Sequence, residues 1–298
     1  MNKKILITGA NGLVGQNLSE LFQPAGYEVI LLDLHEQFRL ESHSNFDYLS
    51  SDITNYSQLK EIIGTFKPHT IVNCAAYTNV DGCETEKELS WKVNVTGPEY
   101  LADLAKRYDS HLIHISSDYV FDGKNGPYTE EDPPNPCSVY GEEKLESEKI
   151  IQATECRHTI IRGIVIFGYG TDIPLNFTSW LTREMKAGNK VNIVTDQWGN
   201  SLFAPDMAKG IFDIFKSGIP GVYHLGNEHF HSRYDFAIEF ANFFGYSSEL
   251  IEPILTVALK QKAERPLKSG LVSEKARSDF GFNTVPLEES FRRIREYR

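Results

Sequence analysis

The stretch LITGANGLVG, residues 6–15, places three glycines directly behind a short apolar run. Gly9, Gly12 and Gly15 follow a predicted strand and open a predicted helix. Their missing side chains permit a tight turn and let backbone N–H groups at the start of the helix approach the phosphates of a ligand. The stretch therefore predicts the first strand, turn and helix of a sheet that binds a dinucleotide.

Asp33 ends the second predicted strand, about 20 residues beyond the glycines, where a carboxylate accepts hydrogen bonds from an adenosine ribose. A carboxylate at this position favours NAD over NADP, because it repels a 2′-phosphate. His35 and Arg39 follow closely and could offset that repulsion. The expected cofactor is therefore NADH or NADPH, and the preference between them stays open.

Short apolar runs alternate with longer amphipathic segments in the first half of the chain, which predicts a parallel sheet with helices on both faces. Strands are expected at residues 4–8, 28–33, 47–49, 70–74, 111–116 and 159–165. Helices are expected at residues 15–23, 56–66, 84–107, 140–153, 176–187, 206–216, 232–244 and 287–297. We expect a Rossmann-type doubly wound α/β fold, with a dinucleotide-binding domain over residues 1–160 and a smaller, mixed substrate-binding lobe over residues 161–298, interleaved with the first.

Composition limits the classes of ligand and partner. The formal net charge of −11 argues against nucleic acid as a partner, because such binding needs a basic face. The chain lacks an apolar run of the roughly 20 residues that a membrane span needs, and its N-terminal lysines lead straight into a strand, so a cytoplasmic location is expected. The four cysteines are scattered, and the histidines at 224, 229 and 231 have no carboxylate or cysteine at matching spacing, so no metal site is expected.

The segment SVYGEEKLESEK, residues 138–149, places Tyr140 and Lys144 four apart at the start of a predicted helix, and therefore on one face. A lysine ammonium there, together with a hydrogen bond from a nicotinamide ribose, can lower the pKa of the phenol from near 10 towards about 7. By spacing alone such a pair is usually an ordinary exposed one. The upstream segment HISSDYVFDG, residues 114–123, changes this interpretation, because it places Ser116, Ser117 and Asp118 at the carboxyl edge of the sheet, where ligands bind in such folds.

These segments together resemble the extended short-chain dehydrogenase/reductase family. Within it, the chain is most similar to the dTDP-4-dehydrorhamnose reductase branch, over essentially its whole length. The similarity rests on TGANGLVG at 8–15, NCAA at 73–76, AAYTNVDGCE at 75–84, ISSDYVFDG at 115–123, YGEEK at 140–144, NF at 176–177, DQWG at 196–199, GVYHLGN at 221–227 and RPLKSGL at 265–271. The resemblance implies NAD(P)H-dependent reduction of a nucleotide-linked 4-keto-6-deoxy sugar, with dTDP-4-dehydro-L-rhamnose as the favoured substrate.

The resemblance also implies roles for individual residues. Tyr140 would protonate the carbonyl oxygen of the sugar, with Lys144 lowering its pKa and binding the nicotinamide ribose. Ser117 would donate a hydrogen bond to the same oxygen, on which negative charge grows in the transition state. The expected substrate contacts are Thr78, Ser117, Asp118, Tyr119, Asn176 and Arg265, of which the Arg265 guanidinium suits a diphosphate. The expected cofactor contacts are Gly9, Gly12, Leu13, Val14, Gly15, Asp33, Asp52, Ile53, Ala75, Ala76, Tyr77, Asn94, Tyr140 and Lys144, and Asn94 is also expected to brace the site.

The chain departs from the pattern of that branch at two places. Residues 162–165 read RGIV where Arg-Thr-Ser-Trp is usual, and Asn200, Ser201 and Leu202 replace Ser-Pro-Thr after DQWG. Two alternatives therefore stay open: a reductase or epimerase of another nucleotide sugar, and a regulatory cofactor-binding subunit that resembles the beta subunit of methionine adenosyltransferase. The sequence also leaves open whether the chain forms a homodimer and whether it requires magnesium.

Overall fold

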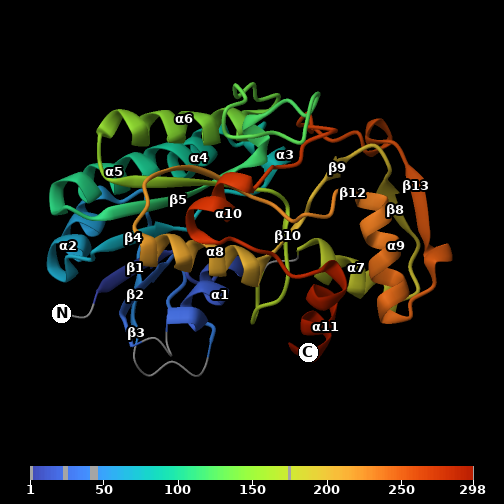
Figure 1. Ribbon diagram of the computed structural model, residues 1–298, viewed down its shortest axis with the longest axis horizontal. Coiled ribbons are helices and arrows are strands. Elements are labelled where there is room, and N and C mark those ends of the chain that lie inside the picture. The colour runs from blue at the N-terminus through green and yellow to red at the C-terminus, as the bar shows by residue number, and fades with distance from the viewer. Residues whose placement is uncertain (1–2, 23–25, 41–45, 174–175, 298) are drawn as a thin grey trace.

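A parallel sheet forms the centre of the computed structural model, which describes residues 3–22, 26–40, 46–173 and 176–297 (Figure 1). Within these residues the sheet has seven strands in the order β11-β6-β5-β4-β1-β2-β3. The order reverses between β1 and β4, which is the switch point at which such sheets bind ligands. The strands are β1 (Lys4–Thr8), β2 (Glu28–Asp33), β3 (Phe46–Ser50), β4 (Thr70–Asn73), β5 (His111–Ser117), β6 (His158–Gly163) and β11 (Gly221–Leu225).

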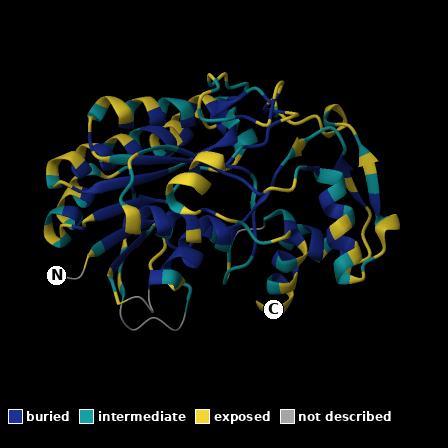
Figure 2. Ribbon diagram, in the orientation of Figure 1, coloured by how far each residue is buried: buried dark blue, intermediate teal, exposed yellow. Residues whose placement is uncertain are grey.

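Helices cover both faces of this sheet, which confirms the predicted doubly wound fold (Figure 1). One face packs on α2 (Tyr56–Phe66), α5 (Gly97–Tyr108) and α6 (Val139–Thr154). The other face packs on α1 (Leu13–Phe22), α8 (Ala204–Ser217) and α10 (Glu274–Phe280). The inner strands are mainly apolar because both faces of the sheet are covered, and Figure 2 shows them as the buried layer of the molecule. The edge strand β3 is only partly buried.

A smaller mixed lobe follows the sheet and has an aromatic core of its own, which includes Phe167, Phe236, Phe240 and Phe291. Its short strands pair as β10 with β7, β12 with β9 and β13 with β8. Its elements are β7 (Ile166–Phe167), α7 (Phe177–Lys186), β8 (Val191–Val194), β9 (Trp198–Gly199), β10 (Leu202–Phe203), β12 (His231–Ser232), α9 (Arg233–Phe244), η3 (Ser248–Leu250), β13 (Ile251–Ile254), η4 (Thr256–Leu259) and α11 (Leu287–Tyr297).

The helix predicted at residues 84–107 is wrong as a single element. The structure divides this region into α3 (Val80–Cys83), α4 (Lys87–Trp91), the π-helical turn η1 (Lys92–Thr96) and α5. Pro98 lies in the first turn of α5, directly after η1, where it lacks the N–H that a continuous α-helix would use. The wide turn η1 places Asn94 against the loop after β4, so the break serves the site.

Other element boundaries differ from the predictions by a few residues. The predicted strand at 159–165 ends earlier, at Gly163, and the predicted helix at 15–23 is α1, whose expected last residue Gln23 lies outside the described residues. The strand β11 was not predicted as an element of the sheet, and it pairs in parallel with β6.

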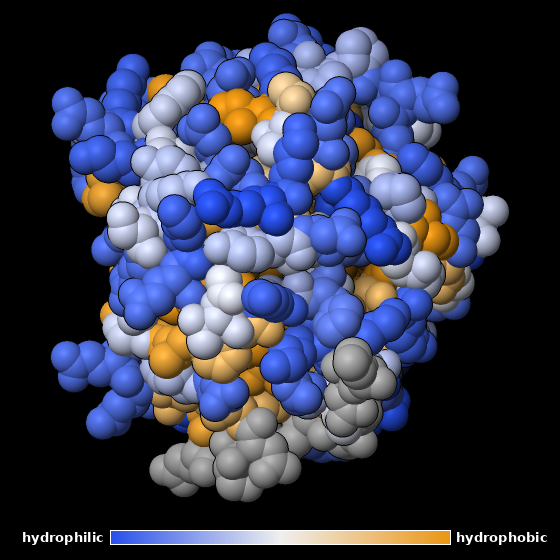
Figure 3. All heavy atoms as spheres, turned by 90° about the vertical axis from the view of Figure 1, so that its left-hand side faces the viewer, coloured by the Kyte–Doolittle hydropathy of each residue, from blue (hydrophilic) through white to orange (hydrophobic). Residues whose placement is uncertain are grey.

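The surface at the left of Figure 1 carries mainly hydrophilic side chains, with small hydrophobic patches between them (Figure 3). Among the described residues, no helix is both long and apolar enough to cross a membrane.

Candidate active site

The glycine-rich turn joins β1 to α1 at the carboxyl edge of the sheet. Gly9 has a φ of +65°, and a Cβ atom there would lie 2.7 Å from the backbone nitrogen of Ala75. The Gly12 N–H donates to the Gly9 carbonyl at 3.0 Å, which closes the turn before α1 begins at Leu13. Gly15 packs directly on the backbone of Gly9 and Ala10. The turn therefore forms a cradle of backbone with Leu13 and Val14 in the first turn of α1, and this cradle fits a pyrophosphate.

Asp33 lies beside this cradle at the end of β2. Its carboxylate accepts hydrogen bonds from the backbone N–H of Asn11 at 2.9 Å and from the backbone N–H of His35 at 3.2 Å, and the His35 ring lies 2.7 Å away. Burial alone would raise the pKa of Asp33, but the hydrogen bonds from His35 and Asn11 outweigh it and lower the pKa. Arg39 contacts the other ring nitrogen of His35 at 2.9 Å. His35 and Arg39 are thus linked to each other beside an ionised Asp33.

The loops after β3 and β4 carry the other expected cofactor contacts. Asp52 and Ile53 follow β3, and Ala75, Ala76 and Tyr77 follow β4. Asn94 accepts a hydrogen bond from the Tyr77 N–H at 2.8 Å and donates to the Tyr77 carbonyl at 3.1 Å and to Glu143 Oε2 at 2.8 Å. Asn94 therefore links the loop after β4 to α6, which is the bracing position expected of it.

The structure brings Ser117, Tyr140 and Lys144 to the carboxyl end of β5. Helix α6 begins after the N-cap Ser138, whose side chain accepts from the Gly141 N–H. Tyr140 and Lys144 lie one turn apart and are 9% and 2% exposed. The Lys144 ammonium donates to the Ile115 carbonyl at 2.7 Å. The Tyr140 ring stands edge-on to that of Tyr119, with ring centroids 5.5 Å apart.

The expected lowering of the Tyr140 pKa is not found in the structure. Burial raises the pKa of Tyr140, the charge of Asp118 adds to this rise, and a hydrogen bond with Ser117 opposes it. Burial lowers the pKa of Lys144 to about 8, against the opposing charges of Glu148 and Glu143. The prediction rested on the Lys144 ammonium together with a hydrogen bond from a nicotinamide ribose, whereas the fold buries both side chains and penalises both charges.

Asp118 and Tyr119 follow Ser117 in the 3₁₀ turn η2 (Asp118–Val120). The Asp118 carboxylate accepts hydrogen bonds from Ser269 at 2.7 Å and from Ser117 at 3.1 Å. Burial raises its pKa to about 6, although these two hydrogen bonds lower it. Burial also raises the pKa of Tyr119 to about 12, with the charge of Asp118 as the next cause. Asp118 therefore ties the end of β5 to the segment at 265–271.

A cavity of about 680 Å³ lies between the sheet edge and the smaller lobe. Its lining includes Tyr119, Arg233 and Arg265 together with Asn176, Phe177 and Trp180. The Arg233 guanidinium lies over the Phe177 ring, 5.7 Å from its centroid. A smaller cavity joins Asp118, Tyr119 and Arg233 to Ser269. Arg265 forms an ion pair with Asp81 at 3.1 Å. Asn176 is the N-cap of α7, and Thr78 is exposed beyond Tyr77.

Arg233 is the site residue that the sequence reasoning missed. It lines both cavities, and it is the first residue of α9, after the N-cap Ser232. A cation is disfavoured at the positive end of a helix dipole, and the nearby carboxylate of Asp118 opposes this effect for Arg233. Nothing in the local sequence marks Arg233 as a site residue, because its position beside Tyr119 and Arg265 depends on tertiary contacts.

The two departures from the pattern of the resembled branch lie in or near this site. Val165 lines both cavities, so a small side chain stands where that branch has tryptophan. Asn200 is buried and donates to the carbonyls of Asn227 and Leu271 at 2.5 and 2.9 Å. The first departure therefore alters the lining of both cavities. In the second, Asn200 forms buried hydrogen bonds that hold neighbouring segments together, and Ser201 lines the smaller cavity.

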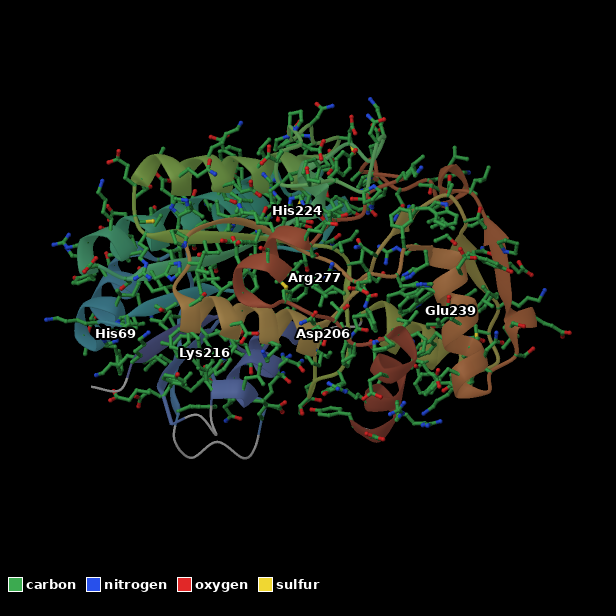
Figure 4. The ribbon with its side chains drawn as sticks, in the orientation of Figure 1. His69, Asp206, Lys216, His224, Glu239 and Arg277 are labelled. Atoms are coloured by element: carbon green, nitrogen blue, oxygen red, sulfur yellow. The ribbon has the colours of Figure 1, made fainter. Side chains whose placement is uncertain are left out.

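The histidines considered for metal binding have other partners. His224 lies in the middle of the molecule, where Figure 4 labels it, with its ring 3.1 Å from the Tyr128 carbonyl and 3.3 Å from Arg162. His231 contacts Ser201 at 3.3 Å. Across residues 3–22, 26–40, 46–173 and 176–297, no three His, Cys, Asp or Glu side chains form a group that could hold a metal ion.

Comparison with known proteins matches the chain along almost its full length. The dTDP-4-dehydrorhamnose reductase of Aggregatibacter actinomycetemcomitans is 35% identical over 99% of this chain and 99% of its own length. The solved structure of dTDP-4-dehydrorhamnose reductase from Bacillus anthracis in complex with NADP has a TM-score of 0.89 at 27% identity and covers 100% of both chains. The methionine adenosyltransferase 2 subunit beta of Xenopus tropicalis is 29% identical over 85% of this chain and 75% of its own length. The model of the RmlD substrate binding domain family matches residues 3–297, so the chain belongs to that family, as its resemblance to this branch of reductases predicts.

Proposed function

We propose that the chain is an NAD(P)H-dependent reductase of a nucleotide-linked 4-keto-6-deoxy sugar, with dTDP-4-dehydro-L-rhamnose as substrate and dTDP-L-rhamnose as product. The observation that carries the proposal is the grouping of Ser117, Tyr140 and Lys144 at the carboxyl edge of the sheet, next to a cavity lined by Arg233 and Arg265. The dTDP-4-dehydrorhamnose reductases among its relatives support the same reaction.

The backbone cradle at Gly9–Gly15 and the carboxylate of Asp33 fit the pyrophosphate and adenosine ribose of a nicotinamide dinucleotide. When bound, the reduced nicotinamide supplies a hydride for the carbonyl carbon of the sugar. Tyr140 donates its phenolic proton to the carbonyl oxygen and becomes a phenolate. The C=O double bond thus becomes a C–O single bond, with a new C–H bond from the hydride and a new O–H bond from Tyr140. A raised pKa keeps Tyr140 in the protonated form that this step needs. Ser117 donates a hydrogen bond to the same oxygen as charge develops on it.

The cavity supports a nucleotide-linked substrate. Arg233 and Arg265 present guanidinium groups that match the oxygens of a diphosphate. Phe177 and Trp180 present aromatic surface on which a nucleobase can stack, and Asn176 lies beside them. In this proposal residues 1–160 bind the cofactor and residues 161–298 bind the substrate, with the two parts interleaved, and the reaction takes place in the cytoplasm.

The test follows absorbance at 340 nm while dTDP-4-dehydro-L-rhamnose is added to the protein with NADPH and then with NADH. We expect oxidation of at least one cofactor, and we expect Tyr140→Phe to slow turnover at least about 100-fold, because a general acid contributes about 10²–10⁴-fold. Tyr100→Phe is the matched control with unchanged turnover, because it removes a phenolic hydroxyl from α5, where the ring packs on Tyr56 of α2. Cofactor binding without oxidation in the unaltered protein contradicts the proposal.

A second candidate is a regulatory cofactor-binding subunit, which the match to a methionine adenosyltransferase beta subunit supports. It predicts cofactor binding without turnover and a stable complex with a larger enzyme in a pull-down. The intact Ser117, Tyr140 and Lys144 favour the reductase.

A further inference from the structure

A row of polar side chains crosses the buried interior of the sheet beneath the candidate active site. Thr8 of β1, Asn73 of β4 and His114 of β5 are register partners on adjacent strands, so their side chains stand side by side. Thr8 and His114 are each 0% exposed, and Asn73 is 1% exposed. The row begins at the residue before Gly9 and ends below Lys144, so it connects the glycine-rich turn with α6.

Each hydrogen bond in this row has a defined direction. The Ala75 N–H and the Thr8 hydroxyl donate to Asn73 Oδ1 at 3.2 and 2.6 Å, which fixes the orientation of the amide. Asn73 Nδ2 must then donate to His114 Nδ1, at 3.0 Å. A neutral imidazole that accepts at Nδ1 carries its proton on Nε2. Burial and the nearby charge of Lys144 lower the pKa of His114 well below its usual value, so the ring is neutral.

The Nε2–H of His114 therefore points at α6. It donates to Ser147 Oγ at 3.1 Å, and the Ser147 hydroxyl in turn donates to the Lys144 carbonyl at 2.7 Å. The Lys144 ammonium lies 3.5 Å from the same Nε2. Because two donors face each other across that distance, the ammonium is directed instead to the Ile115 carbonyl.

We infer that His114 is a positioning residue for Lys144, which it holds in place at the end of a hydrogen-bond chain that starts at the cofactor-binding turn. His114 touches neither the substrate cavity residues nor the glycine turn directly, and it acts through Ser147 and Lys144. The inference deepens the proposed reductase function and rests on it. The buried row of Thr8, Asn73 and His114 takes no direct part in the proposed reaction and instead orients Lys144.

Other groups also face Lys144 and set the background for any pH effect. Glu143 and Glu148 approach it from its own helix, and Glu148 is held by an ion pair with Arg162 of β6 at 2.7 Å. Tyr140 lies one turn before it. These groups stay in place when His114 is changed, so a difference between His114 variants reports the contribution of the imidazole N–H.

The experiment compares His114→Phe, His114→Gln and His114→Asn with the unaltered chain. The measurements are the Kd for NADPH, kcat with dTDP-4-dehydro-L-rhamnose and the basic limb of the kcat–pH profile. His114→Phe removes the hydrogen bonds to Asn73 and Ser147, so we expect kcat to fall about tenfold and the Kd for NADPH to rise. We also expect the basic limb to move to higher pH, because the N–H donor that opposes the Lys144 ammonium is gone. Gln retains the donor to Ser147 and keeps the limb near its original pH, whereas Asn retains only the acceptor for Asn73 and behaves like Phe.

His111→Phe is the matched control, because His111 is a buried histidine of the same strand, bonded to Thr159 Oγ1 at 2.8 Å and away from Lys144. It is expected to lower stability and leave the kinetic constants unchanged. The inference is overturned if His114→Phe and His111→Phe change kcat, the Kd for NADPH and the basic limb equally. It is also overturned if the basic limb lies at the same pH in His114→Gln and His114→Asn. This second comparison provides the test if His114→Phe does not fold. If the unaltered chain shows no turnover, only the proposed function is contradicted. The role of His114 is then tested by the Kd for NADPH, which is compared between the His114 variants and His111→Phe.

Discussion

Asp33 remains ionised at neutral pH although its side chain is mostly buried, because the hydrogen bonds from His35 and Asn11 stabilise its charged form and lower its pKa. Its negative charge disfavours a 2′-phosphate, and the linked side chains of His35 and Arg39 oppose that effect from the same loop. We therefore expect these three side chains to set the preference between NADH and NADPH.

Asp33→Ala is expected to raise the ratio of kcat/KM for NADPH to that for NADH by about tenfold, since removal of the carboxylate leaves His35 and Arg39 unopposed. The measurement is oxidation at 340 nm with each cofactor at a fixed sugar concentration. Asp52→Ala changes a carboxylate that follows the neighbouring strand β3 and is expected to leave the ratio unchanged. A ratio that falls in Asp33→Ala contradicts the assignment of Asp33 to the adenosine ribose.

The wide turn η1 interrupts the α-helical hydrogen-bonding pattern between α4 and α5 and thereby brings Asn94 to the candidate active site. It turns Asn94 towards both the loop after β4 and Glu143 of α6, and Glu143 also accepts a hydrogen bond from Ser90 of α4 at 2.5 Å. A continuous α-helix over 84–107 would rotate these side chains out of register. The break therefore couples the loop that carries Ala75 and Tyr77 to the helix that carries Tyr140.

Asn94→Ala is expected to lower the free energy of unfolding by about 1–3 kcal/mol, because buried partners on Tyr77 and Glu143 lose their hydrogen bonds. It should also raise the Kd for NADPH, since the loop after β4 loses its link to α6. Urea unfolding and cofactor titration measure the two effects. The control is Asn55→Ala, which removes the N-cap of α2 and is expected to cost about 1 kcal/mol without changing the Kd. An unchanged Kd in Asn94→Ala shows that the brace is not needed for cofactor binding.

Across the whole molecule, long-range contacts join the sheet to the smaller lobe and bury groups that titrate. Ser269 bonds to Asp118, 151 residues earlier in the chain, and Tyr128 forms a β-bridge with Leu271. Burial lowers the pKa of His111 to about 4, of His224 to about 3 and of His231 to about 4. These histidines stay neutral in the folded chain at pH values at which an unfolded chain would protonate them.

The stability of the chain is therefore expected to fall as the pH drops from 7 to 5. A histidine with a lowered folded-state pKa contributes its full stabilisation above pH 6.5, and this contribution is lost as the pH falls towards the folded-state pKa. By pH 5 the loss in the free energy of unfolding is about 2 kcal/mol for each such histidine. The raised pKa values of Asp118 and Asp206, each about 6, act in the opposite direction and return about 1 kcal/mol each. Urea unfolding at pH 7, 6 and 5 measures the net loss.

His111→Gln removes one titrating group and should flatten this dependence without altering the position of Lys144. A free energy of unfolding that is constant or rises between pH 7 and 5 contradicts the burial of these histidines as neutral rings. The comparison between the two chains is made at each pH, so the general cost of the substitution cancels.

Local patterns predicted most of the sheet and the first part of the site. Apolar runs and the glycine turn predicted β1, β2, β4 and β5 within a residue or two, and the i, i+4 spacing placed Tyr140 and Lys144 on one helix face. The strand β11 was missed because five residues, GVYHL, carry little periodicity, and only pairing with β6 makes them a strand. Helix 84–107 was wrongly predicted as continuous because its break depends on Asn94 reaching partners outside the helix.

By itself, the sequence determined the glycine turn, the alternation of strands and helices, the pairing of Tyr140 with Lys144 on one helix face, and the family. Each of these depends on residues close together in the chain or on a pattern along it. Only the tertiary structure decided that Arg233, Tyr119 and Arg265 line one cavity, that His114 directs its N–H at α6, and that burial raises the pKa of Tyr140. The physical reason is that burial, tautomer and charge environment arise from groups far apart in sequence that packing brings within a few ångströms of one another.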